Sequence, residues 1–259
     1  MPMVEDEGIC VRHWDWSETS QTVAVMTREH GLVRCLAKGS KREKAPFSGG
    51  VELLMRAELG MIIKPSADLA TLTSWDLIEP MPSARAAFAR YAACMYIADL
   101  IPRAVHDHDP HPVLFEALAN TLAAIGGVES CDIHAVHAWL SWFQWQVLAE
   151  TGSKPEVLID VRTGEDLKAT QPVGFAWELG GLTAMDRHGQ DKGVARISPT
   201  TVGILRRLDA GEAASELTED ADANTRAGCV LAARLRDLFT FEPPTLSWVY
   251  PQIAGQSQG

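Results

Sequence analysis

Six basic side chains gather between residues 28 and 44, and together they have the chemistry needed to bind phosphate groups. The chain as a whole is acidic, with 23 Lys and Arg against 34 Asp and Glu and a formal net charge of −11. Within this stretch only two residues are acidic. Because the screening length at physiological salt is about 8 Å, distant acids hardly weaken a compact basic patch. The six residues are Arg28, Arg34, Lys38, Lys41, Arg42 and Lys44.

Two tryptophans, Trp14 and Trp16, precede the basic stretch at an expected turn and could stack on nucleic-acid bases. Single strands are bound by a positive groove that follows the phosphates and by aromatic rings, each stacked base contributing about 1–3 kcal/mol. We therefore predict a DNA-binding site made of the six basic residues together with Arg12 and Trp16. From the residues alone two alternatives stay open. The basic residues could form a solvated face, with Arg28 paired to an acid, and the tryptophans could pack in the core.

The sequence HDHDPH over residues 106–111 is a candidate metal site, with His106, His108 and His111 as ligands. Imidazole and carboxylate groups this dense could hold zinc or nickel, which would indicate a metal-dependent hydrolase. However, neighbouring residues converge on one ion only with difficulty, and Asp109-Pro110 matches the first two positions of a helix. We therefore expect no metal site here, and the hydrolase is kept as an alternative function.

Three tryptophans recur at helical spacing, at Trp139, Trp142 and Trp145. This spacing is typical of a helix face that packs in a core. An exposed edge of the same face could instead accept an apolar peptide that ends in an acid, provided that a basic side chain lies nearby. The candidate basic residues are Arg90, Arg103, Arg206 and Arg207.

The N-terminal part of the chain, which contains the basic residues and Trp14 and Trp16, is expected to consist of strands. Short segments rich in Val, Ile, Leu and Thr alternate with turn residues, and glycines and a proline favour a loop over residues 38–50. The expected strands are residues 8–14, 20–27, 31–37, 51–63 and 69–78. Five strands in so short a stretch predict a small barrel, for which the OB-fold is the common solution.

After Pro80 and Pro82 the pattern becomes helical, so the predicted fold class is α+β, a five-stranded OB-fold barrel followed by an α-helical domain. A Gly-rich stretch with short β-like pieces interrupts the helices as a small irregular insert. The expected helices are residues 83–107, 113–125, 133–150, 198–209 and 223–241. The predicted domains are 1–80 for the barrel, 81–152 with 198–248 for the helices, 153–197 for the insert, and 249–259 for a disordered tail.

Bulk composition places the chain among ordinary globular proteins. Its length of 259 residues favours two domains, and 46% hydrophobic residues suffice for a core. The five cysteines are odd in number and form no C-x-x-C pair, which indicates a reducing, cytoplasmic location. We expect no secretory signal and no membrane-spanning helix, because no apolar run is long enough.

Several motifs together resemble the RecO family of DNA repair proteins. The first strand reads Gly8-Ile9-Cys10-Val11-Arg12, an acidic and aromatic turn follows at residues 14–18, and Thr27-Arg28-Glu29-His30-Gly31 precedes Ala37-Lys38-Gly39. Further on, LIEPMPSARAAFARYAACMYIADLI looks like that family's passage from barrel to helices. The resemblance extends from about residue 8 to residue 248, with its weakest part at 150–195.

The resemblance implies a recombination mediator that is not an enzyme, with an OB-fold barrel, a helical domain and an insert that often binds zinc. Such a protein binds single- and double-stranded DNA and anneals complementary strands. Its implied partners are RecR and the C-terminal tail of single-stranded-DNA-binding protein, through which RecA is loaded onto gaps. The implied location is cytoplasmic and associated with the nucleoid. A third hypothesis is a protein-only adaptor that has lost DNA binding.

This chain differs from the family in its insert. In the family, the zinc ligands of the insert are two pairs of cysteines. Between Cys131 and Cys229 the sequence contains no cysteine, so the insert has the position but not the ligands of the zinc site. Structural zinc requires four nitrogen or sulfur ligands. We therefore expect no zinc and no other cofactor.

Overall fold

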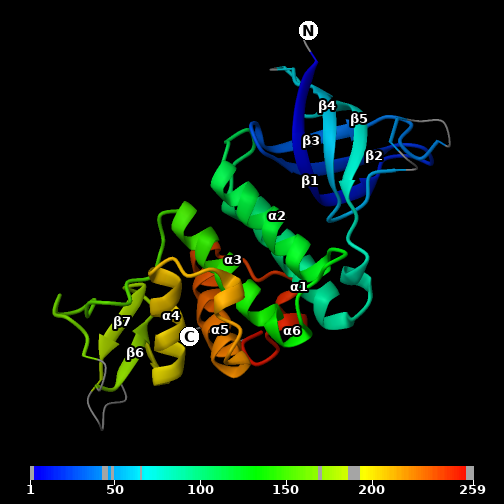
Figure 1. Ribbon diagram of the computed structural model, residues 1–259. Coiled ribbons are helices and arrows are strands. Elements are labelled where there is room, and N and C mark those ends of the chain that lie inside the picture. The colour runs from blue at the N-terminus through cyan, green and yellow to red at the C-terminus, as the bar shows by residue number, and fades with distance from the viewer. Residues whose placement is uncertain are drawn as a thin grey trace. The chain divides into compact units, whose positions relative to one another are not determined.

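Five strands at the start of the chain close into a barrel in the computed structural model (Figure 1). The strands are β1 (Val4–Asp15), β2 (Gln21–Thr27), β3 (Gly31–Ala37), β4 (Arg56–Ile62) and β5 (Ala70–Glu79). Their order is β1-β2-β3-β5-β4, and β1 closes the barrel by pairing with β4. Neighbouring strands are antiparallel except for the parallel pair β3–β5. The predicted OB-fold barrel and the α+β class are thus confirmed.

The structure describes residues 3–42, 46–47, 50–64, 66–168, 171–185 and 193–254. The chain forms two compact units, Met1–Cys131 and Asp132–Gly259. The first contains the barrel and two helices, and the second contains the remaining helices and a small sheet. No helix among the described residues is long and apolar enough to cross a membrane.

The barrel forms because alternate residues of its strands point into a shared core of mostly aliphatic side chains. Val23, Val25, Val33 and Leu72 are almost fully buried in its core. Gly8 permits close packing, because a side chain there would meet Leu59 and Val25 at 2.5 Å. The first strand begins four residues before its predicted start, and the fourth begins at Arg56 rather than at residue 51. Residues 51–55 turn instead, with Leu54 at a φ of 69°.

Two helices complete the first unit, α1 (Phe88–Ala104) and α2 (Pro112–Gly126), after a short 3-10 turn η1 (Ser83–Arg85). The predicted continuous helix from residue 83 is interrupted because Ala87 is extended, with φ −148° and ψ 141°. The predicted range 113–125 agrees with α2 within one residue, but the assignment of Asp109-Pro110 to the helix start is wrong, because His111 precedes the helix and Pro112 is its first residue. Helix α1 packs against α2 and β1.

The second unit is helical around α3 (Val136–Glu150) and α5 (Ala221–Phe239), which pack against each other. Helix α4 (Pro199–Asp209) packs on α5, and Ser198 caps its start, because Ser198 Oγ accepts a hydrogen bond from Thr201 N. Short elements η2 (Ile133–Ala135), η3 (Ala214–Glu216) and α6 (Leu246–Val249) connect or follow these helices. The chain then continues to Tyr250, which is buried, within the tail that we predicted to be disordered.

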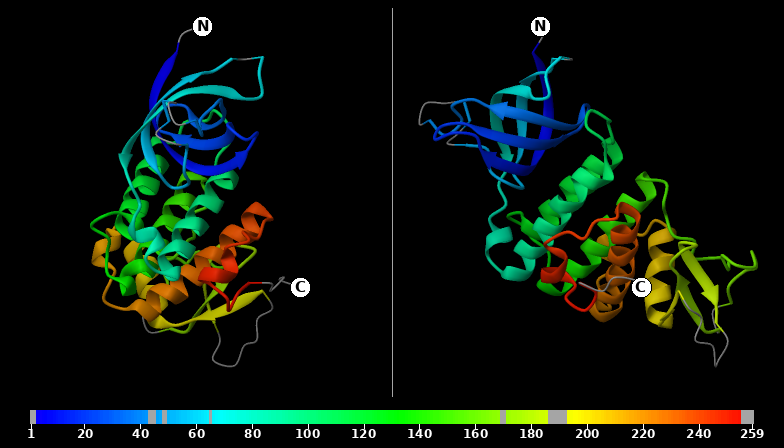
Figure 2. Two further views of the ribbon diagram at one scale, coloured as in Figure 1. Left: turned by 90° about the vertical axis from the view of Figure 1, so that its right-hand side faces the viewer. Right: turned by 180° about the vertical axis from the view of Figure 1, so that it is seen from behind.

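The insert contains a three-stranded sheet of order β7-β6-β8, formed by β6 (Val173–Ala176), β7 (Gly181–Ala184) and β8 (Val194–Ile197). Figures 1 and 2 show this sheet beside α4, at the edge of the second unit. Residues 156–161, where the sequence EVLIDV is one of the short β-like pieces of the insert, make only isolated bridges. The predicted boundaries of barrel, helical domain and insert stay predictions.

Candidate nucleic-acid interface

The turn between β1 and β2 is tied to the segment that follows β3, and this contact forms the candidate site. The amide of Trp16 donates to Ser20 O at 2.9 Å and closes the turn. The amide of Lys41 donates to Thr19 O at 3.1 Å, and that of Gly39 donates to Ser20 Oγ at 3.0 Å. Gly39 has a φ of +67°, which glycine adopts readily. Residues far apart in the sequence are thereby held at one end of the barrel.

Exposed aromatic and basic side chains meet at this end of the barrel. Trp16 is 64% exposed and lines a hollow of about 370 Å³ together with Lys38 and Arg42. Both cations are exposed and make no ion pair with any described residue. We call the set Trp16, Lys38, Lys41 and Arg42 the barrel-end patch. It combines an accessible ring with two cations, Lys38 and Arg42, that make no ion pair with a described acid.

Lys41, the remaining member of the patch, pairs with Asp15 at 2.5 Å. The hydrogen bond from Lys41, together with its charge, holds the pKa of Asp15 below its ordinary value. Asp15 lies on the surface, where water competes with such a pair and makes it weak. A phosphate group could therefore replace Asp15 as the partner of Lys41.

Three other predicted DNA contacts are used within the first unit. Arg12 pairs with Asp99 of α1 at 2.5 Å, and the side chain of Asp99 is only 2% exposed. Arg34 donates from Nε to Asp107 Oδ2 at 2.7 Å. Both pairs join the barrel to the α1 region that follows it in the chain.

Arg28 has the most contacts of the three. It donates to Glu7 at 2.8 Å, forms an ion pair with Glu116 of α2, and lies 4.7 Å from the centre of the Phe115 ring. Burial opposes the ionisation of Glu7, but the guanidinium groups of Arg56 and Arg28 hold its pKa below the ordinary value. Arg28 thus attaches the barrel to α2, and its pair with Glu7 is the contact with an acid that one of our alternatives from the sequence describes.

The structure therefore divides the predicted DNA-binding residues into two groups. It brings together Trp16, Lys38, Lys41 and Arg42 at the barrel end. The residues engaged in ion pairs with the following helices and their connection are Arg12, Arg28 and Arg34. Lys44 lies outside the described residues. The role of each residue in DNA binding stays a prediction.

The histidine segment packs against the start of β3 and brings no metal ligands together. Over the described part of the chain, no group of three or more His, Cys, Asp or Glu side chains could hold a metal ion. The amide of His108 donates to Leu32 O at 3.0 Å, and Asp107 forms a bridge with the same residue. A side chain at Gly31 would meet Asp109 O at 2.2 Å, so glycine permits this close approach.

The tryptophan helix face is largely internal. Trp145 is 3% exposed, which confirms its predicted core position. Trp139 and Trp142 are half-buried, with their rings edge to face at a centroid distance of 6.0 Å. The second unit thus uses this stripe mainly for packing.

Sequence reasoning missed the acidic partners of the basic residues, above all Asp99 and Glu116. Each lies far along the chain from its arginine, and no periodicity links the two positions. It also missed Asp160, which organises the insert. Its carboxylate accepts hydrogen bonds at 2.8 Å from Thr183 Oγ1 and from the amide of Ala184.

Comparison with known proteins gives consistent matches over most of the chain. The family model described as "Recombination protein O N terminal" matches residues 1–81, and "Recombination protein O C terminal" matches residues 85–231. A relative from Rhodopirellula baltica is 30% identical over 218 residues, which cover 84% of this chain and 79% of the relative. One from Bacillus pumilus is 27% identical over 79% of this chain and 76% of its own length. One from Anaeromyxobacter sp. (strain K) is 28% identical over 83% of each chain. All three are named DNA repair protein RecO.

Proposed function

The chain belongs to the recombination protein O family and has a role in DNA repair and recombination, and from this premise we propose that it binds single- and double-stranded DNA and anneals complementary strands. It is a repair mediator rather than a catalytic enzyme. The metal-dependent hydrolase is therefore rejected. This agrees with the packing of residues 106–111 against the start of β3.

The barrel-end patch is the observation that carries the proposal. OB-fold barrels bind oligonucleotides on the face of strands 2 and 3 and on the loop between strands 1 and 2. In this chain Trp16 lies in that loop, and Lys38 follows β3 directly. An exposed ring beside Lys38 and Arg42, which make no ion pair with a described residue, can supply both stacking and phosphate neutralisation. Annealing would use this site to hold one strand while its bases stay accessible to a second.

We further propose the partners that the family resemblance implies. These are RecR and the C-terminal tail of single-stranded-DNA-binding protein, and through them RecA at gaps. We also propose that the protein acts in the cytoplasm without zinc or another cofactor. In support, the insert lacks cysteines, and buried Asp160 makes hydrogen bonds that hold its loop to β7.

Strand annealing by matched charge-reversal variants tests the proposal. Lys38→Glu removes a cation of the barrel-end patch, whereas Lys64→Glu makes the same change in a hollow shared with His30, near the other end of β3. The length of β3 separates these two ends by about 20 Å. We expect Lys38→Glu to weaken annealing about tenfold, as the loss of one charge-assisted hydrogen bond implies, and Lys64→Glu to have little effect.

A protein-only adaptor is the second candidate, and the ion pairs of Arg12, Arg28 and Arg34 favour it because they engage three of the seven predicted cations. If the unmodified protein neither binds nor anneals oligonucleotides at low salt, the adaptor is correct. Equal annealing by the Lys38→Glu and Lys64→Glu variants would place the DNA site elsewhere.

A further inference from the structure

In the first unit, the segment after α2 folds back onto α1 and brings two cysteines into one neighbourhood. Arg90 of α1 donates from Nη1 to Ile125 O at 2.8 Å and from Nη2 to Cys131 O at 2.5 Å. The amide of Cys131 donates to Ala124 O at 2.6 Å. Cys94 lies one helical turn after Arg90, so both side chains are on the same face of α1. The chain at Cys131 is therefore held against the face of α1 that carries Cys94.

The sulfur of Cys94 is directed toward the end of α2. A side chain at Gly126 would meet Cys94 Sγ at 3.3 Å. Burial raises the pKa of the Cys94 thiol to about 12, with a lowering contribution from Arg90 and a raising one from the Cys131 sulfur. The two sulfur atoms are thus close enough for one to affect the ionisation of the other.

The two thiols differ in their access to solvent. Cys94 is fully buried, whereas Cys131 is half-buried and reaches the surface. A small oxidant such as hydrogen peroxide therefore meets Cys131 first, and Cys94 lies behind it as a second thiol. An accessible thiol beside a second cysteine is the usual arrangement of a redox-sensing site.

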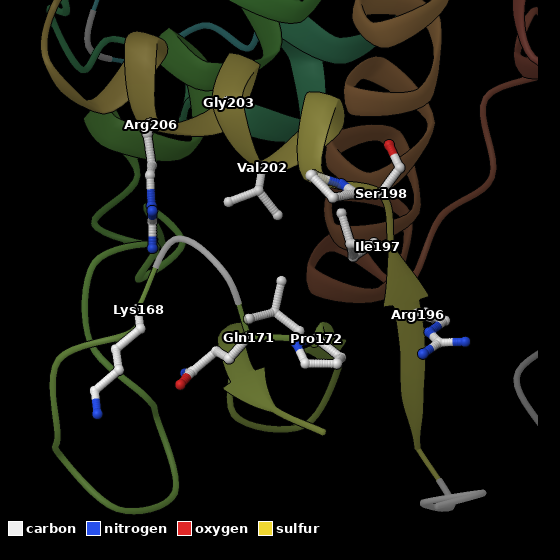
Figure 3. A pocket seen from close by; sticks show the side chains of 11 residues that line it. Lys168, Gln171, Pro172, Arg196, Ile197, Ser198, Val202, Gly203 and Arg206 are labelled. Carbon is white, nitrogen blue, oxygen red and sulfur yellow. The ribbon is translucent and has the colours of Figure 1, made fainter. Parts of the chain in front are cut away.

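The remaining cysteines lack this arrangement. Cys10 and Cys35 are neighbours in the barrel core, but both are fully buried, so an oxidant in solution does not reach either thiol. Cys229 belongs to the second unit, where it lines a hollow of about 380 Å³. Ile197 and Ser198 line the same hollow, and Figure 3 shows them where β8 meets α4. No second thiol is among the described residues of that hollow.

We propose that Cys131 and Cys94 form a reversible disulfide when the protein meets a peroxide. In the first step the Cys131 sulfur is oxidised to a sulfenic acid, and the peroxide is reduced to water. In the second step the Cys94 sulfur displaces hydroxide from the sulfenic acid, and this hydroxide leaves with the Cys94 proton as water. A dithiol restores both cysteines and is itself oxidised to a disulfide.

The disulfide joins α1 to the segment that follows α2, and these two helices hold the barrel. Asp99 of α1 pairs with Arg12, and Glu116 of α2 pairs with Arg28. A cross-link between residues 94 and 131 restricts the unfolded chain and so stabilises the folded first unit. Neither cysteine belongs to the barrel-end patch. This inference goes beyond the proposed function, since it assigns a modification site that leaves the DNA site unchanged.

The test treats the full chain with hydrogen peroxide, alkylates the remaining thiols and maps the disulfides by mass spectrometry. We expect a single disulfide, between the peptides that contain Cys94 and Cys131, and its loss when dithiothreitol is added. Hydrogen exchange in α1 and α2 should become at least about tenfold slower on oxidation. Cys131→Ser should show neither change. Cys229→Ser, which removes the half-buried thiol of the second unit, is the control and should behave like the unmodified protein.

The variant Cys94→Ala tests the order of the two steps. Its Cys131 sulfenic acid has no second thiol and should persist, so dimedone should label Cys131 in this variant but not in the unmodified protein. Absence of the Cys94–Cys131 disulfide, a disulfide through Cys131 between two copies of the chain, or equal dimedone labelling would overturn the proposal. Strand annealing by the oxidised protein should stay normal, so failure of this inference and failure of the proposed function can be told apart.

Discussion

Replacing Arg12 should destabilise the first unit rather than reduce DNA affinity. The Arg12 guanidinium lies 2.5 Å from the carboxylate of Asp99, which is 2% exposed on α1. In Arg12→Met the buried carboxylate loses its compensating charge. Removing one partner of a buried ion pair costs about 3–5 kcal/mol, and the lower end applies here because Arg12 is 34% exposed. This is a large part of a typical domain stability of about 5–15 kcal/mol.

Hydrogen exchange measured across β1 and α1 is the appropriate assay, because it follows the first unit separately from the second. We expect protection in both elements to fall in Arg12→Met by an amount equivalent to about 3 kcal/mol. The double variant Arg12→Met with Asp99→Leu should recover most of this loss, since replacing both charges with apolar groups is often neutral. Arg34→Met is the control, because the Arg34–Asp107 pair is exposed and should contribute below about 1 kcal/mol.

The opposite pattern would refute the division of the basic residues into two groups. If Arg12→Met keeps its exchange protection but binds single-stranded oligonucleotides weakly and with a smaller salt dependence, Arg12 contacts phosphate. If the double variant is as unstable as the single one, the ion pair is not the cause of the loss.

Three further predictions follow from burial and hydrogen bonding. Trp16→Ala should weaken single-strand binding by about 1–3 kcal/mol, measured by anisotropy, and an unchanged affinity would exclude stacking by this ring. Three thiols should resist iodoacetamide at pH 8 until urea is added, because burial raises the pKa of each to about 12. They are Cys10, Cys35 and Cys94. Burial opposes the ionisation of Asp160, but hydrogen bonds from Ala184 N, Arg162 N and Thr183 hold its pKa below its ordinary value. The stabilisation from Asp160 is therefore complete above its unfolded-state pKa and is lost as the pH falls through the lower folded-state pKa. Asp160→Ala should remove the hydrogen-exchange protection of the Ala184 amide at pH 7. Normal protection of that amide would contradict this role of Asp160.

The barrel could be predicted from the sequence because its strands are locally encoded. Val23, Val25 and Val33 are β-branched residues on an alternating pattern, and a turn at Gly31 separates two of the strands. Such signals lie within a few residues of one another, so periodicity detects them. The start of α4 is also encoded by adjacent residues, a capping Ser198 followed by Pro199 at the first helical position.

The division of the basic residues could not be predicted, because it depends on contacts between distant positions. Arg12 meets Asp99, and Arg28 meets Glu116, only after the barrel and helices have packed. From the sequence alone these arginines look the same as Lys38 and Arg42. The conformation of the segment His106–His111 also depends on distant contacts, because its backbone pairs with Leu32 of β3. The sequence alone therefore could not show whether its histidines converge on a metal.

The salt dependence of single-strand binding tests the central claim most directly. If phosphates meet only the three cations of the barrel-end patch, Lys38, Lys41 and Arg42, a slope of about −0.7 per contact gives a log–log slope near −2. The Lys38→Glu variant should then show a slope closer to zero by about 0.7 or more. If the arginines Arg12, Arg28 and Arg34 also met phosphate, six cations would contribute and the slope would be near −4. A slope near −4 or near zero would contradict the claim that only the barrel-end patch meets phosphate.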